Sequence, residues 1–251
     1  GGQDADPGGD FKSEPSAGPS KSGISKANVY DSNFRRETNL EIDPSFGNTI
    51  EFWLKKDGWV STVQERRETI FHAAPSSATG QSYGELQLYA AGTSAGNITF
   101  NLTSGSVSVT NAFNTGLANI ADGAWHHYAF TAITKVTETE LNLYVDGVHR
   151  SKINSSNTVN KITGSMVGAV GALATSLSSS AGGVYAAEGW GNVTSASFDE
   201  FRFWKVARDA QQIGRNWRGQ VGGGTNTDNV KYDDFSNFCL FAAHLLLLSK
   251  I

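Results

Sequence analysis

Seven stretches of the chain alternate between hydrophobic and polar residues with a period of two. In residues 49–54 (TIEFWL), Ile50, Phe52 and Leu54 occupy one set of alternate positions. This period is typical of a β-strand whose two faces meet different surroundings. The other stretches are residues 85–89 (ELQLY), 97–103 (NITFNLT), 125–133 (WHHYAFTAI), 140–145 (ELNLYV), 165–173 (SMVGAVGAL) and 197–205 (SFDEFRFWK).

Turn signals separate these stretches, and helical periodicity is nearly absent. Asp122-Gly123 and Asp146-Gly147 are dipeptides that favour tight turns. Many short strands joined by such turns predict an all-β protein, either a β-sandwich or a jelly roll.

One short helix is predicted after the last strand, in residues 208–218 (RDAQQIGRNWR). Ile213 and Trp217 are four residues apart, which places them on one helix face. Asp209 and Gln212 have the spacing of a capping box, so we expect the helix to begin there.

Composition divides the chain into three parts. Residues 1–23 are rich in Gly, Pro, Ser and Asp, and they predict a flexible linker. Residues 24–220 contain every predicted strand and the helix, and they form the expected domain. Residues 221–251 are a Gly-rich connector followed by an atypical apolar tail. Three interpretations of the tail stay open: a buried terminal strand or helix, an interfacial anchor, or a sequence altered by a frameshift. The apolar run at residues 238–248 is shorter than the about 20 residues of a membrane span, so we expect no span.

Charge and cysteine content narrow the classes of function. The 251 residues carry a formal net charge of −4. Such a chain offers no basic surface for a phosphate backbone, so nucleic acid is not an expected partner. The single cysteine, Cys239, rules out an internal disulfide framework. Because the chain opens without an initiator Met, we expect it to be part of a longer polypeptide.

Two adjacent histidines, His126 and His127, are the first candidates for chemistry. In a strand their side chains point to opposite faces, so the pair cannot chelate one metal ion. We expect His127 to share a face with Trp125, and His126 to share the other face with Tyr128. A buried or half-buried histidine bonded to the backbone is the preferred interpretation for each. No histidine spacing indicates a zinc site.

Acidic pairs are the next candidates, because glycosidases need two carboxylates that flank the sugar bond. Glu41 and Asp43 alternate, but Pro44 follows directly and argues against a central strand. Asp199 and Glu200 are adjacent, so strand alternation predicts that their side chains point apart. A G-x-S-x-G motif is also absent. We therefore predict no catalytic residue and a protein that is not an enzyme.

Calcium is an alternative cofactor, because sandwich rims can hold it with isolated Asp side chains and loop carbonyls. Asp122, Asp146 and Asp199 are the candidate ligands. Turn formation is the preferred interpretation for Asp122 and Asp146. For Asp199 the alternative is a buried carboxylate that accepts backbone N–H bonds.

Three tryptophans are candidates for ligand binding, because a flat aromatic face can stack on a sugar ring. Trp53 lies on the strand face opposite Phe52, and Trp59 follows a Lys-Asp-Gly turn. Trp190 lies in the Gly-rich loop AGGVYAAEGWGN, and it is the preferred candidate because binding residues concentrate in exposed loops. Packing under a loop is the alternative.

Three segments together resemble a known family: WHHYAF, LNLYVDG and FDEFRFWKVARDAQQIGRNW. They are similar to three features of the concanavalin A-like, laminin G-like domain. In order, these are a strand that contains Trp-His, a hairpin that contains Leu-x-Leu-Tyr-Val-Asp-Gly, and a final strand that contains Asp-Glu and leads into a short helix. The resemblance implies a two-sheet jelly-roll sandwich with one short C-terminal helix over residues 24–220. It also implies that Asp199 is the matching position for a metal or rim ligand.

Residues 23–56 and 212–228 resemble the version of this domain in large virion structural proteins of tailed bacteriophages, especially those of marine bacteria. This implies a non-enzymatic adhesion or structural module of a fibre or capsid decoration, at the virion or extracellular surface. Its expected partners are glycans or other virion and cell-surface proteins, in a multimeric assembly. A secreted bacterial carbohydrate-binding domain is the alternative, and a glycoside hydrolase is a third possibility. The family also implies an aromatic closing strand, from which residues 229–251 depart.

Overall fold

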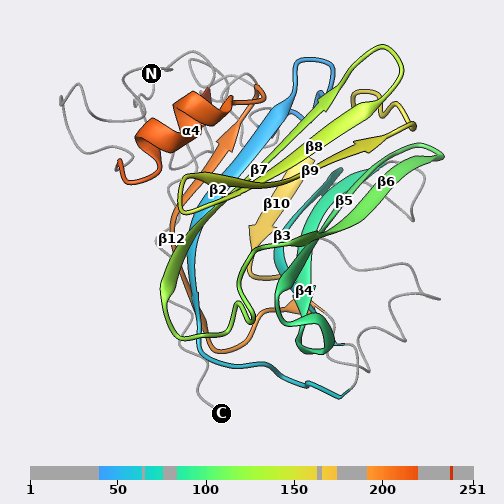
Figure 1. The fold of residues 1–251 in the computed structure, drawn as a ribbon. Coiled ribbons are helices and arrows are strands. Elements are labelled where there is room, and N and C mark those ends of the chain that lie inside the picture. The colour runs from blue at the N-terminus through green and yellow to red at the C-terminus, as the bar shows by residue number, and fades with distance from the viewer. Residues whose placement is uncertain are drawn as a thin grey trace, which may run out of the picture.

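Two β-sheets face each other as the layers of a sandwich, and a short helix lies outside one of them (Figure 1). The computed structural model describes residues 40–63, 66–75, 84–162, 166–173, 191–219 and 238–239. Within these residues, no helix is long and apolar enough to cross a membrane. The predicted all-β sandwich with one short helix near its C-terminal end is confirmed.

Sheet I has the strand order β10-β3-β4-β5-β6, and β11 pairs in parallel with β3. Its other neighbouring strands are antiparallel. The bounds are β3 (Arg67–Pro75), β4 (Glu85–Ala91), β5 (Asn97–Ser104), β6 (Val107–Asn114), β10 (Met166–Val170) and β11 (Gly191–Asn192), with a 3-10 turn, η3 (Gly92–Ser94), after β4.

Sheet II has the strand order β13-β12-β2-β7-β8-β9 and is antiparallel throughout. The bounds are β2 (Asn48–Lys56), β7 (Trp125–Thr134), β8 (Thr139–Val145), β9 (Val148–Ser155), β12 (Ala196–Trp204) and β13 (Phe238–Cys239). The early strand β2 thus lies between β7 and the late strand β12, so the sheet joins both ends of the domain.

Aromatic side chains fill the space between the sheets. The ring centroid of Phe52 on β2 lies 5.7 Å from that of Tyr128 and 6.4 Å from that of Phe201. Phe71 of sheet I reaches across to Phe201, with the ring centroids 4.9 Å apart. Each fully buried side chain of this size contributes about 1.5–3 kcal/mol. These aromatic contacts therefore contribute much of the free energy that holds the two sheets together.

Strand β12 contains a β-bulge at Glu200. The pairing of β12 with β2 shifts between Asp199 and Arg202, and Glu200 has a φ of 49°. One extra residue is accommodated there, so Phe198 and Phe201, three residues apart, are both buried in the core.

A buried carboxylate, Glu51, lies on the outer face of sheet II. Its side chain is fully buried, and it accepts hydrogen bonds from Arg208 at 3.1 and 3.2 Å and from Trp204 Nε1 at 2.7 Å. Arg202 Nη1 lies 3.8 Å from Glu51 Oε1. Burial alone would raise the pKa of Glu51, but attraction to Arg208, His127 and Arg202 holds it below its ordinary value. The carboxylate therefore stays charged beneath the helix.

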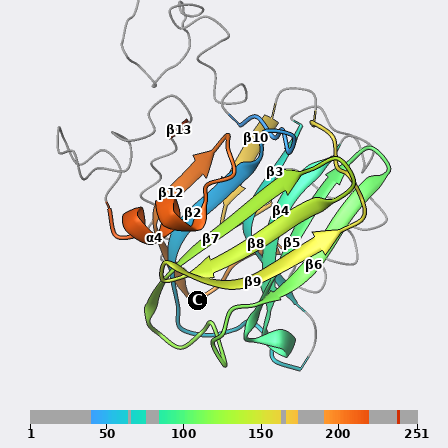
Figure 2. The same cartoon turned by 45° about the horizontal axis from the view of Figure 1, so that its top comes forward.

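Helix α4 (Ala210–Asn216) covers this outer face beside β12, β2 and β7 (Figures 1 and 2). Asp209 accepts the backbone N–H of Gln212 at 2.8 Å, and the Gln212 side chain accepts the N–H of Asp209 at 3.0 Å. The predicted capping box is thus confirmed. At the other end, the buried Arg202 donates to the carbonyl of Asn216, which has no partner inside the helix.

Replacing Arg208 with Ala should destabilise the fold by about 3–5 kcal/mol, because Glu51 would remain charged and buried without its main partner. Urea denaturation measures the free energy of unfolding. The matched control is Arg215→Ala on the exposed side of α4, which should change that free energy by less than about 0.5 kcal/mol. Equal losses in the two variants would contradict this role of Arg208.

Candidate functional site

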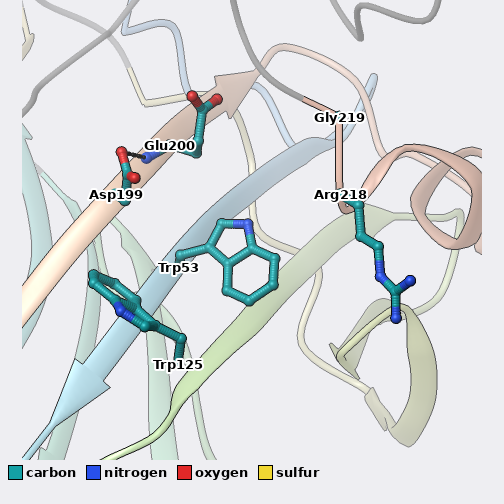
Figure 3. A pocket seen from close by; sticks show the side chains of 6 residues that line it. All are labelled: Trp53, Trp125, Asp199, Glu200, Arg218 and Gly219. Atoms are coloured by element: carbon teal, nitrogen blue, oxygen red, sulfur yellow. Dashed lines mark hydrogen bonds between the residues drawn. The ribbon is translucent and has the colours of Figure 1, made fainter.

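A pocket of about 350 Å³ opens on the outer face of sheet II, next to the end of α4 (Figure 3). It is lined by Trp53 of β2, Trp125 of β7, Asp199 and Glu200 of β12, and Arg218 and Gly219 after the helix. Pockets of this size, with a few polar groups between aromatic walls, are typical of small-ligand sites. Segments far apart in the sequence therefore converge on one candidate site.

Strand register brings the two tryptophans to the same face. In the pairing of β2 with β7, Lys55 lies opposite Trp125 and Trp53 lies opposite His127. Because side chains alternate along a strand, Trp53 and Trp125 both point away from the core that Phe52 fills. Trp125 is 43 % exposed, so its ring is accessible to a ligand.

The bulge at Glu200 determines the acidic side of the pocket. Strand alternation predicted that Asp199 and Glu200 point apart; this is wrong, because the left-handed backbone at Glu200 turns its side chain so that both residues line the pocket. Asp199 Oδ1 accepts the backbone N–H of Glu200 at 2.8 Å. The Glu200 carboxylate lies 3.4 Å from Arg202 Nη2. Both carboxylates are thus held in place by their neighbours.

A triangle of rings supports the tryptophan side of the pocket. The ring centroid of Trp53 lies 5.5 Å from that of Trp217 and 5.7 Å from that of His127. Trp217 packs against Gly147, where φ is +77° and a Cβ atom would come within 2.5 Å of the Trp217 ring. The guanidinium of Arg218 lies 4.4 Å from the centre of the Trp217 ring. Trp53 is therefore fixed before any ligand arrives, which lowers the entropy cost of binding.

The structure brings together two of the predicted site residues, Trp53 and Asp199. Trp59 lies elsewhere and packs against the core, with its Nε1 donating to Asn119 Oδ1 at 2.9 Å. Trp59 therefore packs within the fold, which was the alternative to ligand binding. Trp190 lies outside the described residues. Trp125 and Arg218 were not predicted. Trp125 could have been predicted only from the pairing of residues 49–54 with residues 125–133, which places it on the same face as Trp53. A single sequence does not reveal which strands pair or in which register.

His127 is fully buried on the outer face of sheet II, beneath Trp53. The predicted separation of His126 and His127 onto opposite faces is confirmed. The expected bond from each ring to the backbone is wrong: neither ring nitrogen of His127 has a hydrogen-bond partner among the described residues. Burial lowers the pKa of His127 to about 4, so its ring is neutral at pH 7.

His126 lies between two carboxylates rather than next to backbone groups. Its Nδ1 is 2.8 Å from Asp146 Oδ2, and its Nε2 is 3.1 Å from Asp122 Oδ2. Asp146 also accepts the backbone N–H of His127 at 2.9 Å. Partial burial would lower the pKa of His126, but the hydrogen bonds to Asp146 and Asp122 raise it above its ordinary value. Asp146 and Gly147 also form the predicted turn.

The candidate calcium ligands lie apart from one another in the part of the chain that the structure describes. No three His, Cys, Asp or Glu side chains among the described residues are grouped so that they could hold a metal ion, whereas Ca²⁺ takes about six to eight oxygen ligands. Asp122 and Asp146 are occupied by His126. Binding of Ca²⁺ by Asp199 stays a prediction.

The other acidic pair lies outside the pocket. Glu41 forms an ion pair with Lys161, and Asp43 Oδ1 accepts the backbone N–H of Ser45 at 3.1 Å. These contacts hold the chain that leads into β2, and none involves a pocket residue.

The chain belongs to the concanavalin A-like lectin/glucanases superfamily, because a laminin G-type family model with that description matches residues 35–214. This match spans well over half of the chain. A comparison with curated proteins returned no match.

Several solved structures are similar in fold. A heptameric SAP-like pentraxin from Limulus polyphemus is 15 % identical, with 70 % of this chain and 71 % of that chain covered and a TM-score of 0.47. Domains LG4-5 of the mouse laminin alpha1 chain are 12 % identical, with 68 % and 39 % covered and a TM-score of 0.46. The CBM40 of the Ruminococcus gnavus IT-sialidase is 12 % identical, with 69 % and 90 % covered and a TM-score of 0.43. At these identities the likeness concerns the fold alone.

Acidification should destabilise the fold through His127. Its pKa is about 4 when folded and 6.5 ordinarily, so between these values the unfolded chain binds more protons and stability falls as the pH is lowered. From pH 7 to pH 4, the wild type should lose on the order of 3 kcal/mol more than His127→Gln. Urea denaturation at both pH values measures the difference. Parallel pH profiles would show that His127 is not the group responsible.

The neighbouring His126 should have the opposite effect. Its folded pKa lies above 6.5, so the stability that it contributes is present below pH 6.5 and is lost as the pH rises through the folded value. The advantage of the wild type over His126→Gln should therefore be larger at pH 6 than at pH 9. Thermal unfolding at the two pH values tests this, and an advantage that grows with pH would refute it.

Proposed function

We propose that this domain is a non-enzymatic carbohydrate-binding or adhesion module whose sugar site is the pocket of Trp53 and Trp125. The observation that carries the proposal is the presence of two tryptophan faces and fixed charged groups in one pocket. Tryptophan faces can stack on the apolar face of a sugar ring, while carboxylates and a guanidinium bond its hydroxyls. Membership of the lectin/glucanases superfamily supports the same class of ligand.

Hydrolysis is the second candidate function, because Asp199 and Glu200 both line the pocket. Glycosidases place their two carboxyl groups on either side of the sugar bond, about 5–9.5 Å apart. Here the two acids are consecutive residues of one strand, one bonded to the backbone of the other and the second paired with Arg202. This arrangement favours fixed contacts to hydroxyls over an acid and a nucleophile acting from opposite sides.

Residues 23–56 and 212–228 resemble the domain found in large virion structural proteins of tailed bacteriophages. This resemblance supports a narrower proposal, namely that the domain is a structural module of a phage virion. Such a module would be displayed on a fibre or capsid decoration and would contact glycans of the host surface. Weak single sites are sufficient there, because linked copies raise avidity by about 10²–10⁴. A secreted bacterial carbohydrate-binding domain is the alternative, and the neighbouring genes would distinguish the two.

A glycan array probed with a multivalent display of the full chain tests the sugar site. Replacing Trp125 with Ala should lower the affinity for a bound glycan at least about tenfold, or ~1.4 kcal/mol, because a stacking face is lost. The melting temperature should stay unchanged, since this side chain is 43 % exposed.

The matched control is Phe46→Ala, which removes a 73 % exposed aromatic ring that does not line the pocket and should leave binding intact. Parallel arrays with Ca²⁺ and with EDTA test Asp199 as a metal ligand. Binding that is insensitive to Trp125→Ala would contradict the site, and release of reducing sugar from a bound glycan would favour the hydrolase.

A further inference from the structure

We propose that the pocket selects saccharides that carry a carboxylate, and that Arg218 binds this group. The inference rests on the proposed function and names the chemical class of its ligand. It follows from the way in which the charged groups of the pocket are already paired and from where each of them lies.

Arg218 is presented to the pocket in a supported position. Its guanidinium lies 4.4 Å from the centre of the Trp217 ring, and Trp217 in turn stacks on Trp53. The side chain is exposed, and no carboxylate of the described residues forms an ion pair with it. A planar guanidinium has a fork of N–H donors at its edge, which matches a carboxylate bidentately.

The neighbouring cations already have acidic partners. Arg208 is bonded to Glu51, and Arg202 lies 3.4 Å from Glu200 and donates to the carbonyl of Gly219. The charge of Glu200 is thus offset by Arg202, whereas no carboxylate in the described part of the chain offsets the charge of Arg218. An anionic group on the ligand is the complement that Arg218 lacks.

The charges also lie at different sides of the pocket. Figure 3 shows the Trp53 ring between the acidic pair, Asp199 and Glu200, and Arg218. A sugar ring bound in the pocket and stacked on the exposed ring of Trp125 would therefore direct hydroxyl groups toward the carboxylates and a carboxylate toward Arg218. The reverse orientation would bring like charges together, so the same groups that attract an acidic sugar also reject the wrong pose.

Matched pairs of probes test the inference with the full 251-residue chain. Oligogalacturonate is compared with its carboxyl-reduced counterpart, sialyllactose with lactose, and a sulfated with an unsulfated oligosaccharide, by calorimetry. The first two pairs separate a hexuronate from a sialoside as the source of the carboxylate. At least one carboxylated probe should bind about tenfold or more tightly than its neutral partner, because a charge-assisted bidentate pair is involved. Because Arg218 is exposed, the preference should decrease as salt is added.

Variants then assign the preference to one residue. Arg218→Gln should abolish the preference while leaving the affinity for the neutral probe unchanged, which a merely structural role would not do. Arg218→Lys should restore only part of it, because an ammonium group lacks the fork. Arg215→Gln removes the same charge from α4 outside the pocket and should have no effect.

Three results would overturn the inference. They are equal binding of acidic and neutral probes, a preference for the sulfated probe alone, and equal weakening of both members of a pair by Arg218→Gln. In each case loss of binding in Trp125→Ala would still support the sugar site. If no saccharide binds in any form, the inference and the proposed function both fail.

Discussion

The buried carboxylate of Glu51 constrains the arrangement of the outer face of sheet II. A charge inside the protein costs several kcal/mol unless cations meet it, and here Arg202 and Arg208 do so from two different segments. Arg208 draws the start of α4 onto the sheet, and Arg202 holds the carbonyls of Asn216 and Gly219 at its end. The residues that follow the helix are thereby fixed at the pocket. An apolar core in this place could be equally stable, so the ion cluster contributes above all to the position of the helix.

The bulge in β12 links the core to the pocket. A left-handed backbone at a residue other than glycine costs about 1–3 kcal/mol, and Glu200 bears this cost. The extra residue allows Phe198 and Phe201 to be buried together, and burial of one more phenylalanine contributes about 1.5–3 kcal/mol. The two terms are similar in size, so the irregular strand need not weaken the fold. On the outer face of sheet II, the same bulge places Asp199 and Glu200 in one pocket.

Local sequence patterns predicted the elements whose two faces differ clearly. Residues 49–54 alternate because one face is core, and α4 begins at Asp209 because the capping box is a local motif. Strand β3 was missed because residues on both of its faces are buried, polar ones included, so its sequence does not alternate; β9 was missed because both of its faces are largely solvated at the sheet edge. The pocket was only half predicted. Trp53 could be selected from its own strand, whereas Trp125 depends on register between distant segments.

The adjacent histidines show how far local pattern can reach into electrostatics. Alternation alone places His126 and His127 on opposite faces, but it says nothing about what covers each face. The His127 ring is covered by Trp53 and Trp217 and is neutral at pH 7, since no carboxylate among the described residues bonds to it and compensates its burial. The other meets two carboxylates that turns bring to the strand end, and its charged form is favoured. The protonation state of each histidine therefore depends on long-range contacts, as does the set of residues that line the pocket. These contacts follow from the strand register and from the position of the helix, not from the residue type.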